Sequence, residues 1–540
     1  MGNVVESESV GVLRGRVREK RTFVTLPVFN KIGAKRHHFK EEVQMEKKLV
    51  YDIHDKPKFP QLIVFALQQV LAILAATIAV PTIIGLPTQI PAAILGAGIG
   101  TLVYQLFTKF KSPVFLGSSF AFLNSLFVAV AYGYCGIILG SVVAGLVYVV
   151  IALVIRVTGT SWVNKLMPPV IIGPTVAIIG LSLAGNAMKD MVSANSSAVN
   201  GSYNLVALLC GLVCFFVIVI CSTQKKIRMA RLIPFIIGIG AGYLVAALFT
   251  LIGSLAGLDY LMIIDFKPLV NNFVAADGSF RGITAILNFP DFALIEAIKE
   301  IANGTVKLNL GSALEVVVAF LPVALVVFAE HIADHKNLSS IIGKDLIEDP
   351  GLDNTLLGDG VGSIVGTVFG VCPNTTYGES VGCVAITKNA SVATITTTAF
   401  MCIGLSFISP VMALLQTIPK CVMGGACLTL YGFIAVSGLK MFKELDLNES
   451  KNLFVVASIL ISGIGGLTIQ IPYALAANGA VDKAIQVTSI ATALILGIVT
   501  NAVLTKVENS KLGVDPDEQL EADESNATEE EAAKEDETVQ

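Results

Sequence analysis

Stretches of about 20 apolar residues recur along this chain from Gln61 to Leu504, which is the length that a helix needs to cross a bilayer. Only helices and closed barrels can satisfy their own backbone groups in the hydrocarbon region. With 54% apolar and 14% charged residues, the composition also lies outside the range of soluble proteins. The sequence therefore predicts an all-α polytopic membrane protein.

We expect about fourteen transmembrane spans, each with boundaries uncertain by several residues. They run over residues 61–85, 90–107, 114–131, 134–157, 168–188, 204–222, 232–253, 313–337, 354–371, 377–391, 394–416, 421–439, 452–471 and 484–504. With this count, most of the 37 Lys and Arg residues fall on one side of the membrane. Because Lys and Arg gather in cytoplasmic loops, the pattern predicts an even number of spans with both termini in the cytoplasm.

The two ends of the chain differ from this body. Residues 1–45 carry a basic cluster without sustained apolar periodicity, and residues 505–540 are rich in Asp and Glu. Both ends are predicted to be disordered, and a patch attracted to anionic lipid is the alternative for the first. No apolar segment typical of a cleaved signal peptide follows the basic cluster, and Met45 is an alternative start.

The two halves of the apolar body repeat one another. Residues 116–122 and 373–379 both place two hydroxyl residues before an aromatic one, and residues 168–173 and 419–424 both begin with Pro and end with Gly. The offset of about 250 residues corresponds to seven spans, and an odd number of spans inverts the second copy relative to the membrane. We therefore expect a first repeat at 46–253, an extracellular loop at 254–312 and a second repeat at 313–504.

The repeated segments 116–122 and 373–379 interrupt spans 3 and 10 with residues that disfavour helix. Gly and Pro break helices, whereas Ser, Thr and Tyr favour extended or capping geometry. We expect short strands there, followed by helix N-termini whose free N–H groups form a substrate site near the midplane. The alternative is that both segments are ordinary loops outside the membrane.

Two carboxylates are expected at this site. Glu379 ends the second break, and Glu330 lies about fifteen residues, or roughly 22 Å, beyond Glu315 along the eighth span. A carboxylate at that depth costs several kcal/mol unless it is paired or lines a wet cavity, so Glu330 and Glu379 are candidate substrate ligands. Asp334 lies one turn after Glu330 on the same helix face, while Glu315 is expected to be solvated.

Three further polar residues have structural interpretations. Asp359 is expected to cap or bridge helices, His331 to pack or hydrogen-bond within the bundle, and His335 to lie at the membrane interface. The nine Cys residues include no CxxC pair and are expected to be small buried thiols.

This set of groups suits a neutral planar ligand such as a nucleobase. Carboxylates accept hydrogen bonds from ring N–H groups, and backbone N–H groups donate to ring carbonyls. Burial favours the protonated form of a carboxyl group, so one of them can load and release a proton, as proton symport requires. The sequence shows no metal-ligand spacing, Gly-rich phosphate loop or clear nucleophile–base pair, so no enzyme, cofactor or nucleic-acid partner is expected.

Several motifs resemble a known family. They are Ala329-Glu330-His331-Ile332, Lys344-Asp345-Leu346, Asp349-Pro350-Gly351-Leu352 and residues 373–379. Together they are similar to the nucleobase-ascorbate, or nucleobase:cation symporter-2, transporter family, and within it to the bacterial uracil permeases. The resemblance extends from Leu49 to the last span and leaves out residues 1–45.

The resemblance implies a core domain of spans 1–4 and 8–11 that moves against a gate domain of spans 5–7 and 12–14 like an elevator, often in a homodimer. It implies that the base is held by Glu330 and Glu379, with backbone at Phe120 and Gly378 contacting its carbonyls and Tyr377 and Ala76 beside the pocket. Proton coupling would fall to Glu330 with Asp334. Pocket support would come from Gln69, Ser380, Thr387 and Lys388, the last two from outside direct contact.

Three positions depart from the family pattern. Gln69 stands where the first span commonly has His, Ser380 where Asn is usual, and Asp334 where some uracil permeases have His. Residues 374–379 still favour uracil over xanthine. The function implied is uracil:proton symport; the alternatives are a symporter of xanthine or another nucleobase, and an anion exchanger on the same architecture, which would need a cationic pocket.

Overall fold

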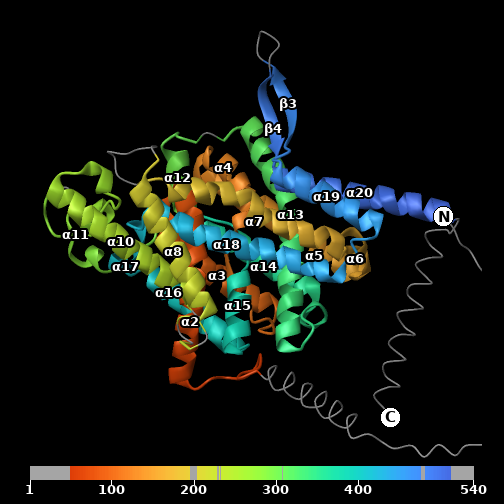
Figure 1. The fold of residues 1–540 in the computed structure, drawn as a ribbon, viewed down its shortest axis with the longest axis horizontal. Coiled ribbons are helices and arrows are strands. Elements are labelled where there is room, and N and C mark those ends of the chain that lie inside the picture. The colour runs from red at the N-terminus through yellow and green to blue at the C-terminus, as the bar shows by residue number, and fades with distance from the viewer. Residues whose placement is uncertain are drawn as a thin grey trace, which may run out of the picture. The chain divides into compact units, whose positions relative to one another are not determined.

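The computed structural model describes residues 49–512 apart from 195–202, 225, 228–229, 231–232, 276, 307 and 476–480. The predicted N-terminal extension at 1–45 lies outside the described residues. The prediction of a disordered tail from residue 505 is wrong for residues 505–512, which continue the last helix, and the rest of that tail lies outside the described residues. The described chain folds mainly into helices (Figure 1).

The first half contains eight helices and one strand among the elements described here. They are α2 (Phe59–Ile83), α3 (Ile90–Phe107), β1 (Leu116–Ser118), α4 (Leu123–Val130), α5 (Gly133–Thr158), α6 (Ser161–Leu166), α7 (Pro169–Met191), α8 (Leu205–Thr223) and α10 (Pro234–Ala256). Proline stands in the first turn of α7 and of α10, where its missing N–H is not needed. The Asn204 side chain caps α8 by accepting from the amides of Val206 and Ala207.

Two short helices, α11 (Lys267–Phe273) and α12 (Ala293–Ala302), connect the halves. The second half contains α13 (Leu310–Ile342), α14 (Leu352–Phe369), β2 (Asn374–Thr376), α15 (Gly378–Thr387), α16 (Val392–Ser406), α17 (Ser409–Gln416), α18 (Lys420–Lys440), α19 (Ser450–Ile464), β3 (Ile469–Leu475), β4 (Val481–Val487) and α20 (Ser489–Leu512). A capping box between Asn309 and Ser312 begins the long helix α13.

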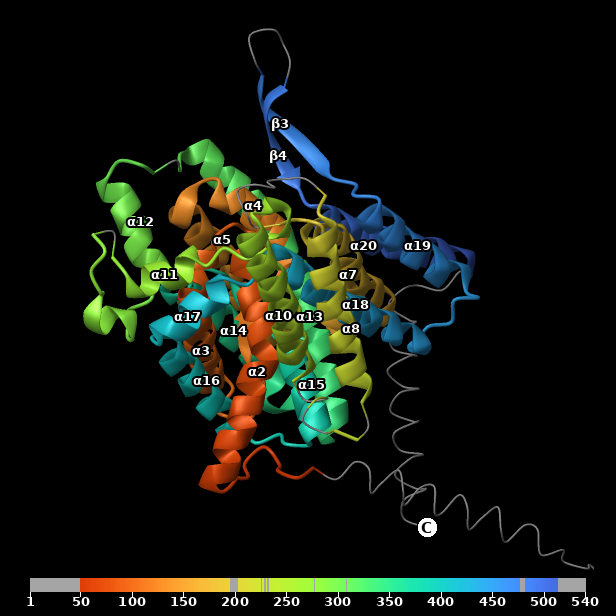
Figure 2. The ribbon, with the colours of Figure 1, turned by 60° about the vertical axis from the view of Figure 1, so that its left-hand side comes forward.

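The two halves contact each other through equivalent helices, as expected of two inverted repeats. Helix α3 packs on α14, and α7 packs on α18, so equivalent helices meet in both cases. Other contacts also come in equivalent pairs (Figures 1 and 2). The contact of α14 with α5 corresponds to that of α3 with α16, and the contact of α18 with α8 to that of α7 with α19. The contact of α8 with α10 corresponds to that of α19 with α20. The predicted inverted-repeat plan is therefore confirmed.

Glycines let the paired helices approach closely. A β-carbon on Gly96 of α3 would overlap the carbonyl oxygen of Gly366 on α14, and one on Gly438 of α18 would overlap that of Gly173 on α7. Small residues at such crossings are typical of membrane helices, whose association depends on close van der Waals packing.

Nine helices in the described part of the chain are long and apolar enough to cross a membrane. The five other predicted spans correspond to the broken segments around β1 and β2, to α14, to α16 with α17, and to the short helix α19. Helix α14 is long enough but carries six Gly or Asp residues among its apolar ones, roughly one in three. The count of fourteen spans stays a prediction.

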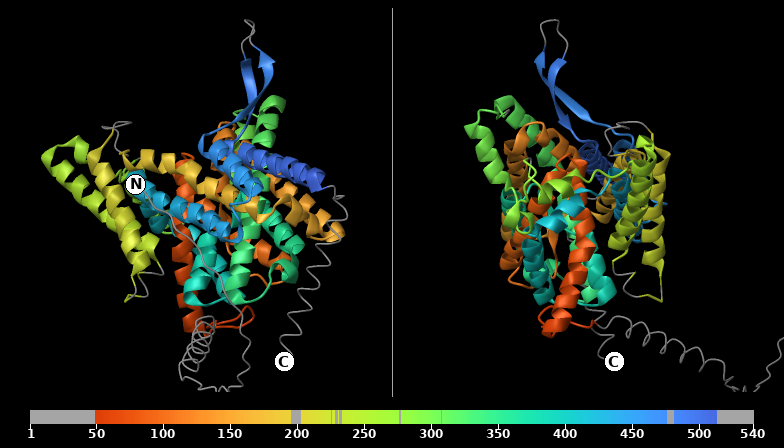
Figure 3. Two further views of the ribbon diagram at one scale, coloured as in Figure 1. Left: turned by 45° about the vertical axis from the view of Figure 1, so that its right-hand side comes forward. Right: turned by 90° about the vertical axis from the view of Figure 1, so that its left-hand side faces the viewer.

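The structure corrects the end of the thirteenth predicted span. Helix α19 ends at Ile464, and β3 (Ile469–Leu475) and β4 (Val481–Val487) pair as an antiparallel hairpin. This hairpin projects away from the helices in each view (Figure 3). Leu467, Ile469 and Ile471 continue the apolar composition of α19 beyond its last turn, which is why apolarity alone extended the predicted span to residue 471.

The segment between α10 and α13 is held by backbone bonds to the turn between α16 and α17. Asn288 N donates to Phe407 O, and Ser409 N donates to Ile286 O, both at 3.0 Å. Helix α12 packs on α5 and α14. The segment expected as an external loop therefore has its own secondary structure and covers the ends of these helices.

Candidate functional site

Two short strands from distant parts of the chain pair among the helices. In the antiparallel pair, Leu116 of β1 lies opposite Thr376 of β2, and every residue of both strands is buried. The Thr101 hydroxyl of α3 bonds both backbone groups of Leu116, accepting from the amide at 2.9 Å and donating to the carbonyl at 3.2 Å. The strands predicted in spans 3 and 10 are confirmed, and the alternative of two external loops is wrong.

A helix begins directly after each strand. A 3₁₀ turn over Phe120–Phe122 and α4 follow β1, and α15 follows β2. The first backbone hydrogen bond of α15 runs from Val381 N to Tyr377 O, so the amides of residues 378–380 precede the intrahelical ladder. Such a terminus presents N–H donors and a partial positive charge. It can therefore bind a carbonyl oxygen.

Three carboxylates gather beside this terminus. Glu330 and Asp334 lie one turn apart on α13, Glu379 lies in the first turn of α15, and all three are half-buried. Glu330 interacts electrostatically with both of the others. Its Oε2 atom is buried and accepts no hydrogen bond from the described residues. This oxygen is available to an N–H donor of a ligand.

The backbone at Gly378 faces Asp334 across accessible space. Gly378 is exposed although its neighbours in β2 are buried, and a β-carbon there would meet only Asp334 Oδ1, at 3.8 Å. The Thr376 hydroxyl donates to Asp334 Oδ2 at 2.7 Å and fixes the position of that carboxylate. The strand β2 thus connects the two helices that carry the acidic groups.

Two aromatic residues flank the helix N-termini. The Tyr377 hydroxyl donates to Ser118 O at 2.9 Å and lies 3.4 Å from Thr77 Oγ1 of α2. Phe120 is buried, and its ring packs edge-on against Tyr431 of α18 with centroids 5.2 Å apart. Ala76 of α2, one residue from Thr77, is completely buried.

The four predicted supporting residues lie at the two ends of α15. Gln69 of α2 donates a hydrogen bond to the Ser380 hydroxyl, and both side chains are buried. Thr387 and Lys388 stand at the C-terminal end, about 12 Å along the helix from Glu379. There the Thr387 hydroxyl donates to Cys383 O at 2.7 Å, and Lys388 ends the helix in the left-handed conformation.

Asp359 of α14 bridges three elements, as expected from the sequence. Its Oδ2 atom bonds His331 Nδ1 of α13 at 2.7 Å and the Thr375 hydroxyl of β2 at 3.0 Å. His331 also contacts Thr355 Oγ1 at 3.0 Å, so it hydrogen-bonds within the bundle, as predicted. The network fixes β2 against the helix that carries Glu330.

The prediction that His335 lies at the membrane interface is wrong. Its side chain is completely buried, stacks on His331 with ring centroids 4.1 Å apart, and bonds Tyr104 OH at 2.8 Å. Residues four apart lie on one helix face, but this spacing gives no signal for Tyr104, which lies on α3.

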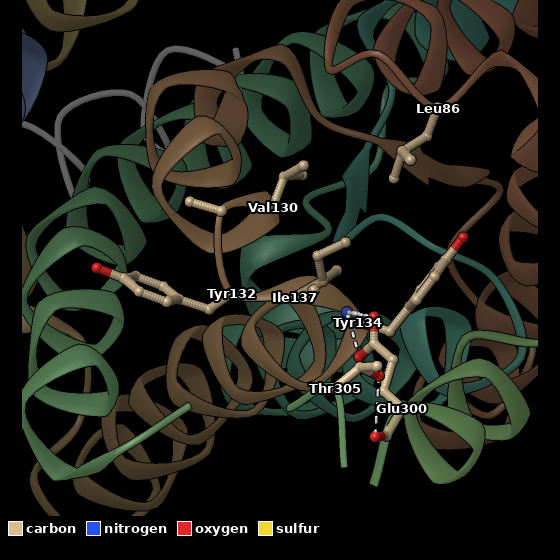
Figure 4. Close-up of a pocket in the computed structure, with 9 residues that line it drawn as sticks. Leu86, Val130, Tyr132, Tyr134, Ile137, Glu300 and Thr305 are labelled. Atoms are coloured by element: carbon tan, nitrogen blue, oxygen red, sulfur yellow. Dashed lines mark hydrogen bonds between the residues drawn. The ribbon is translucent and has the colours of Figure 1, made fainter. Parts of the chain in front are cut away.

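Two cavities lie away from the predicted site residues. One, of about 320 Å³, is lined by Leu86, residues 130–134, Ile137, Glu300 and Thr305. In it the Glu300 carboxylate accepts from Tyr134 N at 3.0 Å and so holds α12 against the start of α5 (Figure 4). The other, of about 410 Å³, lies between the 265–291 segment and α17.

Comparison with known proteins gives matches over most of the chain. Residues 60–472 match the family model described as "Permease family". The chain is 36% identical over 460 residues to the uracil permease of Bacillus caldolyticus, which covers 85% of this chain and 95% of the relative. It is 32% identical over 426 residues to the uracil permease of Escherichia coli (strain K12), and this match covers 78% of this chain and 88% of the relative.

Solved structures share the fold. The murine Solute Carrier 26 family member A9 anion transporter, in the inward-facing state, superposes with a TM-score of 0.56 at 11% identity. That match covers 92% of this chain and 77% of the other. At this identity the likeness concerns the architecture alone.

Proposed function

The chain belongs to the Permease family, and from that premise we propose that it imports uracil together with a proton. The observation that carries the proposal is the group of carboxylates beside the N-terminus of α15, with Glu330 Oε2 lacking a partner among the described residues. Relatives at 32% and 36% identity that are named uracil permeases support the choice of ligand.

Uracil carries two N–H donors and two carbonyl acceptors that alternate around part of its planar ring. In the proposed complex, Glu330 and Glu379 accept from the N–H groups, while the amides at Phe120 and Gly378 donate to the carbonyls. Tyr377 and Ala76 border the ring.

The proton accompanies the base on a carboxyl group. Glu330 is the proposed carrier, with Asp334 beside it, because the acidic groups interact and cannot all ionise at low cost. A membrane potential of 100 mV acting on one proton supplies about 2.3 kcal/mol, enough for roughly fifty-fold accumulation of a neutral solute. No other cofactor is proposed.

Transport proceeds by an elevator-like motion of two domains. The proposed core domain comprises α2–α5 and α13–α17, and the proposed gate domain comprises α7–α10 and α18–α20. Two chains form the proposed homodimer. The contact of Phe120 with Tyr431 joins the proposed core to the proposed gate, and it supports a site at the boundary between them. The protein resides in the cell membrane with both termini in the cytoplasm.

Two alternatives remain as outcomes of the test. Another nucleobase such as xanthine could fit the same donors and acceptors, and the fold is shared with an anion transporter. Three half-buried carboxylates repel an anion, which favours the neutral base.

The test is uptake of radiolabelled uracil in cells that lack their own uracil transporter, with and without a protonophore. Uptake that collapses with the protonophore is the expected result. Sulfate and xanthine are measured in the same cells. Absence of uracil uptake by protein shown to be in the membrane would refute the proposal, and uptake of xanthine or sulfate would identify which alternative holds.

A further inference from the structure

The segment before the first span runs along the turn that follows α15. Residues 50–53 and 388–392 share four backbone hydrogen bonds of 2.7–3.3 Å, and Tyr51 forms a parallel bridge with Asn389. The Ser391 hydroxyl adds a bond to Asp55 O at 2.6 Å. The end of α15 is therefore paired with a segment more than 300 residues away, roughly as a strand would pair.

The same segment is tied to α13. Asp52 Oδ2 lies 2.7 Å from Lys344 Nζ, and Lys344 is the second residue after the last residue of that helix. The other carboxylate oxygen of Asp52 accepts from Ile53 N at 2.7 Å, which fixes the side chain. The hydrogen bond from Lys344 lowers the pKa of Asp52, so this carboxyl group is ionised at neutral pH.

An apolar cluster fills the space between these links. Ile53 is 5% exposed and belongs to a cluster separate from the main core of the protein. The cluster contains Leu338 and Ile342 from α13 and Val381 and Val384 from α15. Both helices that carry the acidic site groups therefore end against one segment (Figure 2).

We propose that residues 49–55 form a positioning clamp that sets the spacing between the Glu330–Asp334 face of α13 and Glu379 on α15. A helix is stiff over ten residues, so a shift at the end of α15 displaces its first turn as well. Ligand groups must be held within a fraction of an ångström for productive geometry. Asp52 and Ile53 are the positioning residues; neither touches the ligand. The effect of the clamp on ligand binding rests on the proposed function, whereas its effect on the position of α15 does not.

The first test exchanges the charges of the ion pair in the full chain. Asp52→Lys and Lys344→Asp should each raise the apparent KM for uracil about threefold to tenfold, with Vmax within about twofold. The double variant restores the pair and should restore KM. Lys111→Asp breaks another 2.7 Å pair, with Asp349, that does not touch α15, and it should leave KM unchanged. Unchanged KM in both single variants would overturn the clamp.

The second test does not require uracil. Amide hydrogen exchange is measured on the purified chain for Ile53→Ala and for the conservative Ile53→Val. Faster exchange at Ala390, Val392 and the last turn of α15 in the alanine variant, with wild-type exchange in the valine variant, is expected. If the alanine variant exchanges faster only at residues 49–55, the clamp is overturned, because α15 is then held in place without these residues. A wild-type chain that takes up no uracil would refute the proposed function, while this exchange result still decides the clamp.

Discussion

At the scale of one residue, Glu330 has an oxygen atom whose burial lowers the stability of the protein. Its Oε2 atom is buried and has no hydrogen-bond partner among the described residues, and the same holds for Asp359 Oδ1. Nearby hydroxyl groups donate to the Oδ2 atoms of Asp334 and Asp359. Leaving a buried acceptor unpaired costs about 1–3 kcal/mol, and more for a charged one. The helix face that bears Glu330 is therefore suited to a ligand rather than to stability.

Replacing Glu330 with Gln should abolish concentrative uracil uptake while the protein remains in the membrane. The amide keeps the shape and one acceptor but cannot take up a proton in the working pH range. The measurement is accumulation against a gradient, with surface amount determined in the same cells. Normal accumulation would remove Glu330 from the coupling role.

The pair of Gln69 and Ser380 should behave as one energetic unit. Each single change to Ala leaves a buried polar group without its partner and should lower stability by about 1–3 kcal/mol. The double change removes both groups, so its effect should be smaller than the sum of the two. Thermal unfolding in detergent measures the three variants, and simple additivity would show that the hydrogen bond has little weight.

For single residues, sequence reasoning gave the position of Glu330 but not its role. An acidic residue far from either end of an apolar run is expected to face other polar groups, and Glu330 does lie beside Asp334 and Glu379. That it binds a ligand stays a prediction. The position of His335 could not be predicted, since its partner Tyr104 lies 231 residues away in the chain. Helix periodicity reports which face a side chain shares, not which distant group meets it.

At the scale of elements, the broken spans were the most predictable feature. Gly, Pro and hydroxyl residues at 116–122 and 373–379 compete with helix formation, and both segments indeed contain strands. The hairpin of β3 and β4 was not predicted, because Ile469 and Ile471 prolong the apolar run of α19 and resemble the flank of a span. The composition of a segment shows whether it is apolar enough to cross a membrane better than it shows whether the segment is a strand or a helix.

The crossing of α3 and α14 should be sensitive to one methyl group. Gly96→Ala forces a β-carbon against the Gly366 carbonyl and should cost about 1–3 kcal/mol, as overpacking does in other cores. Gly404→Ala, on α16, meets nothing within 4 Å and serves as the control. The melting temperature of each purified variant gives the comparison. Equal melting temperatures would mean that α3 and α14 can move apart to accept the methyl group at no cost in stability.

At the scale of the whole molecule, the proposed core and gate domains meet at Phe120 and Tyr431. A cysteine pair at these two positions, bridged by a reducible bifunctional thiol reagent, should stop uptake, and a reductant should restore it. A pair at Phe122 and Phe320, whose ring centroids are 5.7 Å apart, lies within the proposed core. Bridging that pair with the same reagent should leave uptake intact. Transport that continues with the first pair crosslinked would exclude relative motion at this contact.

The pairing of β1 with β2 also has a consequence for how the protein is made. Strand β1 has no partner strand until β2 has been made, and the paired residues Leu116 and Thr376 are 260 positions apart in the chain. At about 5–20 residues per second, the ribosome needs roughly 13–52 s to make the 260 residues between them. Exposed strand edges are unstable in lipid. The nascent first half must therefore be sheltered during synthesis, by the insertion machinery or by its own neighbouring helices, until its complement arrives.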